Sequence, residues 1–282
     1  MPGGGSHEGA ATVSGDSIAA SAGQAARKVS QSPWLERAAR VGFVVSGVLH
    51  LLIAYIAVQV AWTRPSAKAD QSGALSLLAH HGWGEVVLWV GVVGFAALGV
   101  WQVTEALLPR VGDVKEQLGP RAKALAKGVV YLVLAVSTLS FARGSGSSSS
   151  KQSRDFTASL MSHSGGRVLV VCVGLAVIGV GGYHVYKGVT KKFRQDLVGN
   201  PGAVVEHLAL AGYVAKGIAL GIVGVLFCIA GARQQPSKAT GLDGALRTLR
   251  EQPLGGVLLT LVALGLAAYG LYSFARARRA RF

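Results

Sequence analysis

Six apolar runs, each long enough to cross a lipid bilayer, constrain this chain more than any other feature of its sequence. They lie at roughly 41–62, 84–108, 124–142, 166–190, 204–231 and 254–275. A helix rises 1.5 Å per residue and needs about 20 residues to cross ~30 Å of hydrocarbon. Inside hydrocarbon the backbone must satisfy its own hydrogen bonds, so each run is expected to be a helix. The sequence therefore predicts an all-α integral membrane protein with six transmembrane helices.

The charge of the chain is concentrated at the ends of these runs. Only 15% of the residues are charged and 51% are hydrophobic, yet the formal net charge is +15. Basic residues at the ends of apolar runs favour anionic lipid headgroups over nucleic acid. The expected partners are membrane lipids with anionic headgroups, with another membrane protein as the alternative and no nucleic acid.

The two ends of the chain are expected on the cytoplasmic side. Residues 1–32 are rich in Gly, Ser and Ala and lack the hydrophobic segment of a cleavable signal peptide, which predicts a disordered tail followed by an uncleaved first span. The side that holds both termini, including the basic tail 277–282, carries more lysine and arginine than the other side. By the positive-inside rule both termini should be cytoplasmic.

The six runs form three repeats of a helical hairpin. The odd runs align as "SGVLHLLIA", "KGVVYLVLA" and "KGIALGIVG", starting at Ser46, Lys127 and Lys216. The even runs end in "GVW", "GGY" and "GLY", and the two alignments keep the same register to within one residue. The repeats occupy residues 33–108, 120–190 and 204–276, and they predict a bundle with pseudo-threefold symmetry.

With these motifs, residues 34–276 resemble a family of bacterial membrane proteins grouped as domain of unknown function 1206. The motifs that carry the resemblance are the small residue and glycine at the start of each odd run and the Gly-x-aromatic end of each even run. In this family a paired-helix unit occurs three times. The resemblance implies this fold and the bacterial cytoplasmic (inner) membrane, and it implies no activity.

Each loop on the outer side has apolar residues at helical spacing just before the returning run. The residues are Leu75 and Leu78, Phe156 and Leu160, and Leu246 and Leu249. This spacing predicts a short amphipathic helix lying in the outer membrane interface. The alternative is a loop docked on its own hairpin.

Ionisable residues inside the runs are the candidates for a polar membrane site. Lys127 and Lys216 lie about one turn inside the cytoplasmic boundary, from which their side chains can reach headgroups. Glu105 should lie at the depth of Lys127 and pair with it, and Lys216 is the competing partner. His50 is near the midplane, where it is either a neutral histidine bonded to a neighbouring helix or a proton or solute site.

Histidine and cysteine patterns do not predict a metal or cofactor. A membrane haem would require His50 to meet His184 or His207, which lie nearer the cytoplasmic ends of their runs. On the outer side, the candidate metal set is His80, His81 and His163, but Gln252 takes the equivalent place in the third repeat. Cys172 and Cys228 are both inside runs and suggest neither a disulfide scaffold nor a metal motif.

The predicted function is that of a non-enzymatic membrane protein. No catalytic motif is present, and no acidic residue occupies the midplane position that ion-coupled transporters usually require. We expect a structural, accessory or partner-binding role, with no catalytic residue, cofactor or metal. The alternative is a passive or proton-linked conduit for a small solute around His50. The candidate polar membrane site comprises His50, Glu105, Lys127, Lys216 and His184.

Overall fold

The computed structural model describes residues 33–107 and 114–281, so the predicted tail 1–32 lies outside the described residues. In this part of the chain all regular elements are helices apart from one isolated β-bridge between Leu197 and Ala280. The long helices are α2 (Pro33–Trp62), α4 (Gly84–Leu107), α5 (Val114–Ala142), α7 (Gly166–Val189), α8 (Ala203–Ala232) and α10 (Gly255–Arg279). The short ones are α3 (Gln71–Ala79), α6 (Ser149–Met161), α9 (Gly241–Arg250), η1 (Lys192–Asp196) and η2 (Pro236–Lys238).

All six predicted runs are long apolar helices, long enough to cross a membrane. The start of α5 differs most from the sequence prediction, at Val114 rather than near residue 124. The start of α2 also differs, at Pro33 rather than at Val41. The helix extends further because Leu35 and Ala38 pack against Ala97 of α4. An apolar stripe on one face sustains a helix even where charged residues interrupt the continuous run.

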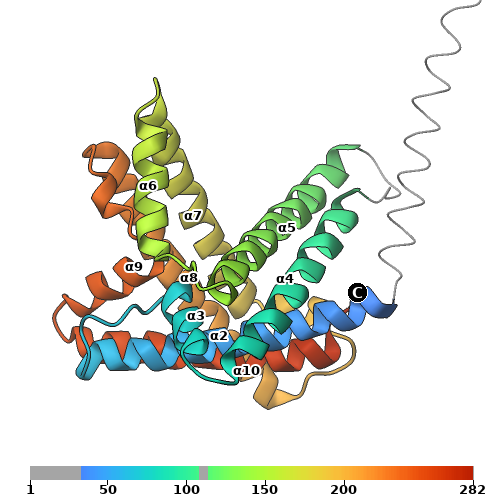
Figure 1. The fold of residues 1–282 in the computed structure, drawn as a ribbon. Helices are drawn as coiled ribbons and strands as arrows, with labels where there is room; N and C mark the ends of the chain where they lie inside the picture. Colours follow the sequence, from blue (N-terminus) through green and yellow to red (C-terminus); the bar gives the residue numbers. More distant parts are fainter. Residues whose placement is uncertain (1–32, 108–113, 282) are drawn as a thin grey trace, which may run out of the picture.

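The long helices pack in a continuous row. In order along the row they are α5, α4, α2, α10, α8 and α7, and each packs on the next. The largest apolar core lies where α2 and α10 meet α3 and α4. Figure 1 shows α2 and α10 side by side, with α4 and α5 forming one arm and α6 and α7 another that diverges from it. Among the described residues, α5 and α7 do not pack along each other.

Glycines allow close contact wherever one repeat meets another. The three pairs that occupy equivalent repeat positions are Gly99 with Gly128, Gly181 with Gly217, and Gly270 with Gly47. A Cβ added to Gly181 would lie 2.7 Å from the carbonyl oxygen of Gly217. One added to Gly47 would lie 2.9 Å from the carbonyl oxygen of Gly270. Small residues are what membrane helices need to approach so closely, since hydrocarbon supplies no hydrophobic force between them.

The three predicted outer helices are present as α3, α6 and α9. Placement of α3 and α9 in the lipid interface was wrong, because Leu75, Leu78 and Leu246 are buried in the protein. These two helices instead pack on the long helices of their own hairpins, as the alternative prediction has it. The helix of the second repeat differs, since Phe156 of α6 is 61% exposed.

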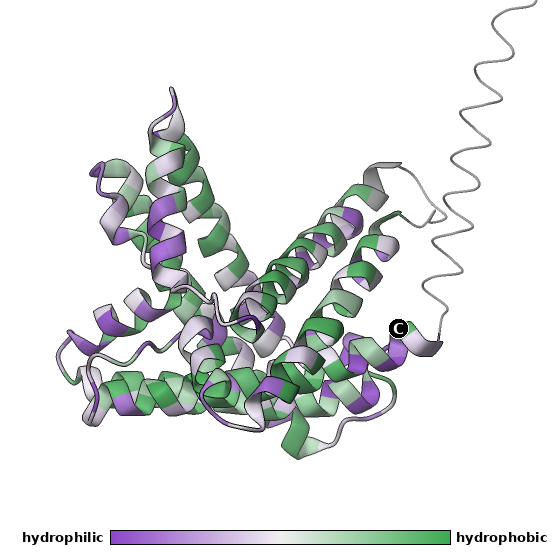
Figure 2. Cartoon of the chain, viewed as in Figure 1, coloured by the Kyte–Doolittle hydropathy of each residue, from purple (hydrophilic) through white to green (hydrophobic). Residues whose placement is uncertain are grey.

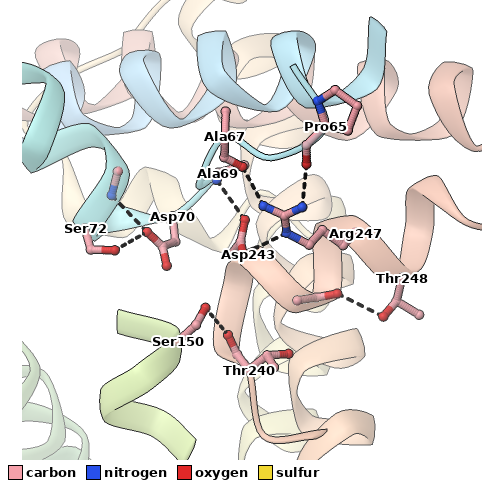
Figure 3. Close-up of polar contacts among 12 residues, drawn as sticks. Pro65, Ala67, Ala69, Asp70, Ser72, Ser150, Thr240, Asp243, Arg247 and Thr248 are labelled. Carbon is pink, nitrogen blue, oxygen red and sulfur yellow. Dashed lines mark hydrogen bonds and ion pairs between the residues drawn. The ribbon is translucent and has the colours of Figure 1, made fainter. Parts of the chain in front are cut away.

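An ionic network fastens α9 to the loop between α2 and α3 (Figure 3). Arg247 donates hydrogen bonds to the carbonyl oxygens of Pro65 and Ala67, at 2.7 Å for Ala67. The Asp243 carboxylate accepts from Arg247 Nε and from the backbone N–H of Ala69, both at 2.9 Å. Charge-assisted bonds of this kind are stronger than neutral ones, so the loop is fixed to α9.

Three further hydrogen bonds lie at the same end of the molecule (Figure 3). Asp70 caps α3 by accepting hydrogen bonds from the Gly73 N–H at 3.0 Å and the Ser72 hydroxyl at 2.6 Å. Ser150 of α6 donates to the carbonyl oxygen of Thr240 at 2.8 Å, just before α9. The outer parts of the second and third repeats are thereby joined.

The start of α2 and the end of α10 lie together at the opposite end of the molecule. Arg40 donates to the carbonyl oxygens of Ala277 at 2.9 Å and Arg278 at 2.8 Å. These are carbonyls of the last turn of α10, which lack partners within the helix and attract a positive charge. The two ends of the described chain are therefore on the same side.

Candidate functional site

A pocket of about 300 Å³ lies between α2, α4, α5 and α10, at the end of the molecule where the described chain begins and ends. We call it the cationic pocket, and its charged lining residues are Lys127, Arg276, Arg281, Glu105 and Asp196. A second hollow of about 490 Å³ shares Glu105 and Lys127 and adds Lys123 of α5. We call this second hollow the outer lobe.

Arg276 lies in the last turn of α10, where the apolar run ends. Its guanidinium carbon is 4.3 Å from the centre of the Phe43 ring on α2, a cation–π arrangement. The Nε atom of Arg276 is buried and has no hydrogen-bond partner within the described part of the chain. A buried donor left without a partner is costly, so this atom is available to a ligand that offers an acceptor.

Asp196 forms another wall of the cationic pocket, at the end of η1. Its carboxylate is 2.5 Å from Lys187 Nζ, and its carbonyl oxygen accepts from the backbone N–H of Arg281 at 3.0 Å. Burial raises the pKa of Asp196, but Arg276 and Lys187 outweigh burial and hold this pKa below its ordinary value. Asp196 is therefore ionised at neutral pH.

The charges around the cationic pocket favour a negatively charged ligand. Lys127, Arg276 and Arg281 line it against two carboxylates, Glu105 and Asp196. Lys187, which does not line the pocket, pairs with Asp196, so the positive charges of the lining residues outnumber the negative ones. Arginine and lysine donors around a small hollow are the chemistry that binds phosphate and carboxylate groups.

The loop that carries Asp196 is held by further ion pairs. Glu206, at the start of α8, lies 3.2 Å from Lys191 and also pairs with Arg194. The backbone N–H of Val198 donates to the carbonyl oxygen of Arg279 at 2.7 Å. These contacts fix one wall of the pocket relative to the end of α10.

His50 and Lys216 form a separate polar contact deeper in the helices. Lys216 Nζ lies 3.5 Å from His50 Nε2 and 4.2 Å from the centre of the Tyr269 ring. His50 Nδ1 is 2.7 Å from the carbonyl oxygen of Ser46, so Nδ1 carries the proton and Nε2 is left as an acceptor. This arrangement places the His50 imidazole against the side-chain nitrogen of Lys216.

A cluster of aromatic rings connects this contact to the loop around Asp196. Tyr213 lies 5.4 Å from Tyr269, 5.6 Å from Tyr272 and 5.9 Å from Phe193, measured between ring centres. The Tyr272 side chain is fully buried. Edge and offset contacts of this kind stabilise packing, so the cluster holds α8 and α10 in register below the pocket.

The five predicted site residues fall into three places. Glu105 and Lys127 line the same pocket, and His50 contacts Lys216. His184 contacts neither of these pairs. Its Nδ1 is 2.8 Å from the Val180 carbonyl oxygen, and its ring centre is 5.7 Å from the ring centre of Tyr213. The structure does not gather the five into one site.

Three charged residues of the pocket were not predicted as site residues from the sequence. Arg276 is the third-repeat equivalent of Glu105, so the repeat register carried a signal for it. Asp196 and Arg281 lie outside the repeated helices, and no pattern pointed to them. They come to the pocket through the backbone pairing of the loop after α7 with the end of the chain.

The outer histidines do not meet in a metal-binding group. His80, His81 and His163 each bond, through Nδ1, a carbonyl oxygen four residues earlier in the chain. No group of three or more histidine, cysteine or acidic side chains suited to a metal ion occurs in the part of the chain that the structure describes.

Comparisons with known proteins identify the family of this chain. The family model described as Domain of Unknown Function (DUF1206) matches residues 41–108, 122–191 and 211–280, once in each repeat. The chain is also similar to the "Uncharacterized protein YxxB" of Bacillus subtilis (strain 168), with 26% identity over 257 residues, which are 87% of this chain and 91% of the relative. No solved structure matches. With three copies of the family unit along its six apolar helices, the chain belongs to the Domain of Unknown Function (DUF1206) family.

Proposed function

We propose that this chain is a non-enzymatic, accessory protein of the bacterial cytoplasmic membrane that binds an anionic group in its cationic pocket. The observation that carries this proposal is the convergence of Lys127, Arg276 and Arg281 on one hollow of about 300 Å³. The buried Arg276 Nε supports it, because a phosphate or carboxylate oxygen would supply the acceptor that this atom lacks among the described residues.

Binding fits the pocket better than turnover. Among the described residues that line it there is no serine, cysteine or histidine to act as a nucleophile or as a neutral-pH base. Arg276 is held over the Phe43 ring, and a cation fixed in this way is suited to recognising an anion. This chemistry corresponds to the partner-binding role expected from the sequence.

The proposal places the pocket and both termini on the cytoplasmic side, with the three hairpins related by a pseudo-threefold axis. The excess of lysine and arginine supports this orientation. The three equivalent glycine pairs support the symmetry at the contacts between repeats, whereas within the described part of the second repeat α5 and α7 do not pack along each other and depart from it. Cysteine labels in the tail and after Arg194 should be protected from an impermeant reagent in intact cells, whereas labels in 144–150 should react.

The binding test uses purified protein in detergent with inorganic phosphate and glycerol phosphate as probes, measured by calorimetry. Lys127→Gln and Arg276→Gln should each weaken binding about tenfold or more, the loss of one charge-assisted contact. Lys68→Gln is the matched control, because Lys68 lines a different, outer pocket. Absence of binding, or equal binding by all four proteins, would rule out the proposed site.

A conduit around His50 is the second candidate, and the contact between Lys216 and His50 is the observation that favours it. A lysine beside a histidine can exchange a proton with it. If this function is correct, His50→Leu abolishes proton or solute flux in proteoliposomes while the protein stays folded. A fully active His50→Leu variant would exclude the residue from the mechanism.

A further inference from the structure

The second repeat lacks the glycines that bring the two helices of a hairpin together. Gly42 in the first repeat and Gly212 in the third correspond to Lys123 in the second. Their equivalents on the returning helix, Gly94 and Gly265, correspond to Ala176. A Cβ on Gly42 would lie 2.5 Å from the carbonyl oxygen of Gly94, and one on Gly212 would lie 2.6 Å from the Cα of Tyr269.

The outer helix of the second repeat shows the same departure. Ala74 of α3 and Ala245 of α9 are equivalent residues, and both are fully buried. Phe156 occupies this position in α6, where its side chain is 61% exposed. A phenylalanine does not fit where the other repeats bury an alanine, so α6 cannot dock as α3 and α9 do.

The hairpin formed by α5 and α7 is therefore open. These two helices end the row of packed helices and diverge in Figure 1, and most of their residues are hydrophobic in Figure 2. On α5, Leu125, Val129 and Val133 are each at least half exposed. Where the other repeats have a glycine contact, Lys123 of α5 reaches α7, with Nζ 2.9 Å from the Tyr183 hydroxyl oxygen.

The open hairpin adjoins the proposed anion site. Lys123 and Lys127 both line the outer lobe and lie one helical turn apart on α5. The exposed apolar residues of α5 continue from these lysines toward the other end of the same helix. Positive charge at one end of an apolar surface is complementary to a molecule with an anionic head and hydrocarbon tails.

We propose that the ligand of the cationic pocket is an anionic phospholipid taken from the bilayer. Its phosphate lies in the cationic pocket against Lys127 and Arg276, and its acyl chains pass Lys123 in the outer lobe and lie along the open faces of α5 and α7. This inference rests on the proposed function and narrows it, because an anionic group is also available from soluble phosphate esters.

Two variants with equal charge separate the lipid from a soluble ligand. Lys123→Gln removes the charge and keeps a long side chain between α5 and α7. Lys123→Gly with Ala176→Gly also removes the charge, but it restores the small residues that the other repeats have at these positions. Native mass spectrometry of each protein, purified from nanodiscs of mixed phosphatidylglycerol and phosphatidylcholine, measures retained lipid. Calorimetry with glycerol phosphate measures the headgroup site and shows that the variant is folded.

The wild type should retain phosphatidylglycerol in preference to phosphatidylcholine, and Lys123→Gln should retain about tenfold more of it than the double glycine variant. Both variants should bind glycerol phosphate equally. Retention of the two lipids in their bulk ratio, or equal retention by the two variants, would overturn the lipid inference and leave anion binding intact. Failure of the wild type to bind glycerol phosphate or phosphatidylglycerol would refute the proposed function itself.

Discussion

Replacing Gly181 by alanine tests the packing between the second and third repeats. The added methyl group would lie 2.7 Å from the Gly217 carbonyl oxygen and 2.9 Å from the Gly221 nitrogen. Both separations are shorter than van der Waals contact, and both partners are helix backbone, which cannot rotate away. The two helices must separate, and overpacking of this kind costs about 1 to 3 kcal/mol. We expect Gly181→Ala to lower the free energy of unfolding by about 2 kcal/mol.

The adjacent glycine provides the control. A Cβ on Gly182 would meet no atom within 4 Å, so Gly182→Ala should be neutral or stabilise the helix by up to about 1 kcal/mol. Unfolding free energies are measured by steric trapping or by SDS titration in mixed micelles. Gly181→Ala combined with Gly217→Ala should cost less than the sum of the two, because the helices separate only once. Equal effects of Gly181→Ala and Gly182→Ala would refute the reasoning.

Three further predictions concern the ion pairs. Arg247→Met should cost about 2 kcal/mol, because two backbone carbonyls and Asp243 lose a charged donor, whereas Arg250→Met on the same helix should cost under about 0.5, as measured by thermal unfolding. The pKa of Asp196 is lowered in the folded state, so the stability that this group contributes is present above about pH 4 and is lost as the pH falls through the folded pKa. Asp196→Asn should therefore make the free energy of unfolding less dependent on pH in this acid range. In a double-mutant cycle of Glu105→Gln with Lys127→Met, coupling above about 1 kcal/mol would indicate a desolvated pair, and strictly additive losses would mean that Lys127 only reaches the headgroups.

The helices were predictable because hydrocarbon leaves the backbone few choices. A run such as that ending at Trp62 must be helical to cross a bilayer, and the structure confirms all six runs. The start of α2 was not predictable from continuous hydropathy, because it depends on Leu35 meeting Ala97 of another helix. Glycine positions indicated close packing, but which glycines face each other depends on how the helices cross.

The candidate site was only partly predictable, for a similar reason. Depth along a helix can be estimated from the sequence, and Glu105 and Lys127, which were expected at the same depth, line one pocket. The direction in which a side chain points around the helix was not, so the contact of Lys216 with His50 required the structure. Asp196 lies between the repeated helices and reaches the pocket only in the folded structure, so neither hydrophobic periodicity nor the repeats predict it as a site residue.

The most direct test of anion binding is a crystal structure of the protein grown in a lipidic mesophase doped with phosphatidylglycerol. The account predicts phosphate density in the cationic pocket, with oxygens about 3 Å from Lys127 Nζ and from the Arg276 guanidinium. It is contradicted if the pocket holds only water and Arg276 turns to bond Glu105 directly, because the cations would then be neutralised by the protein itself.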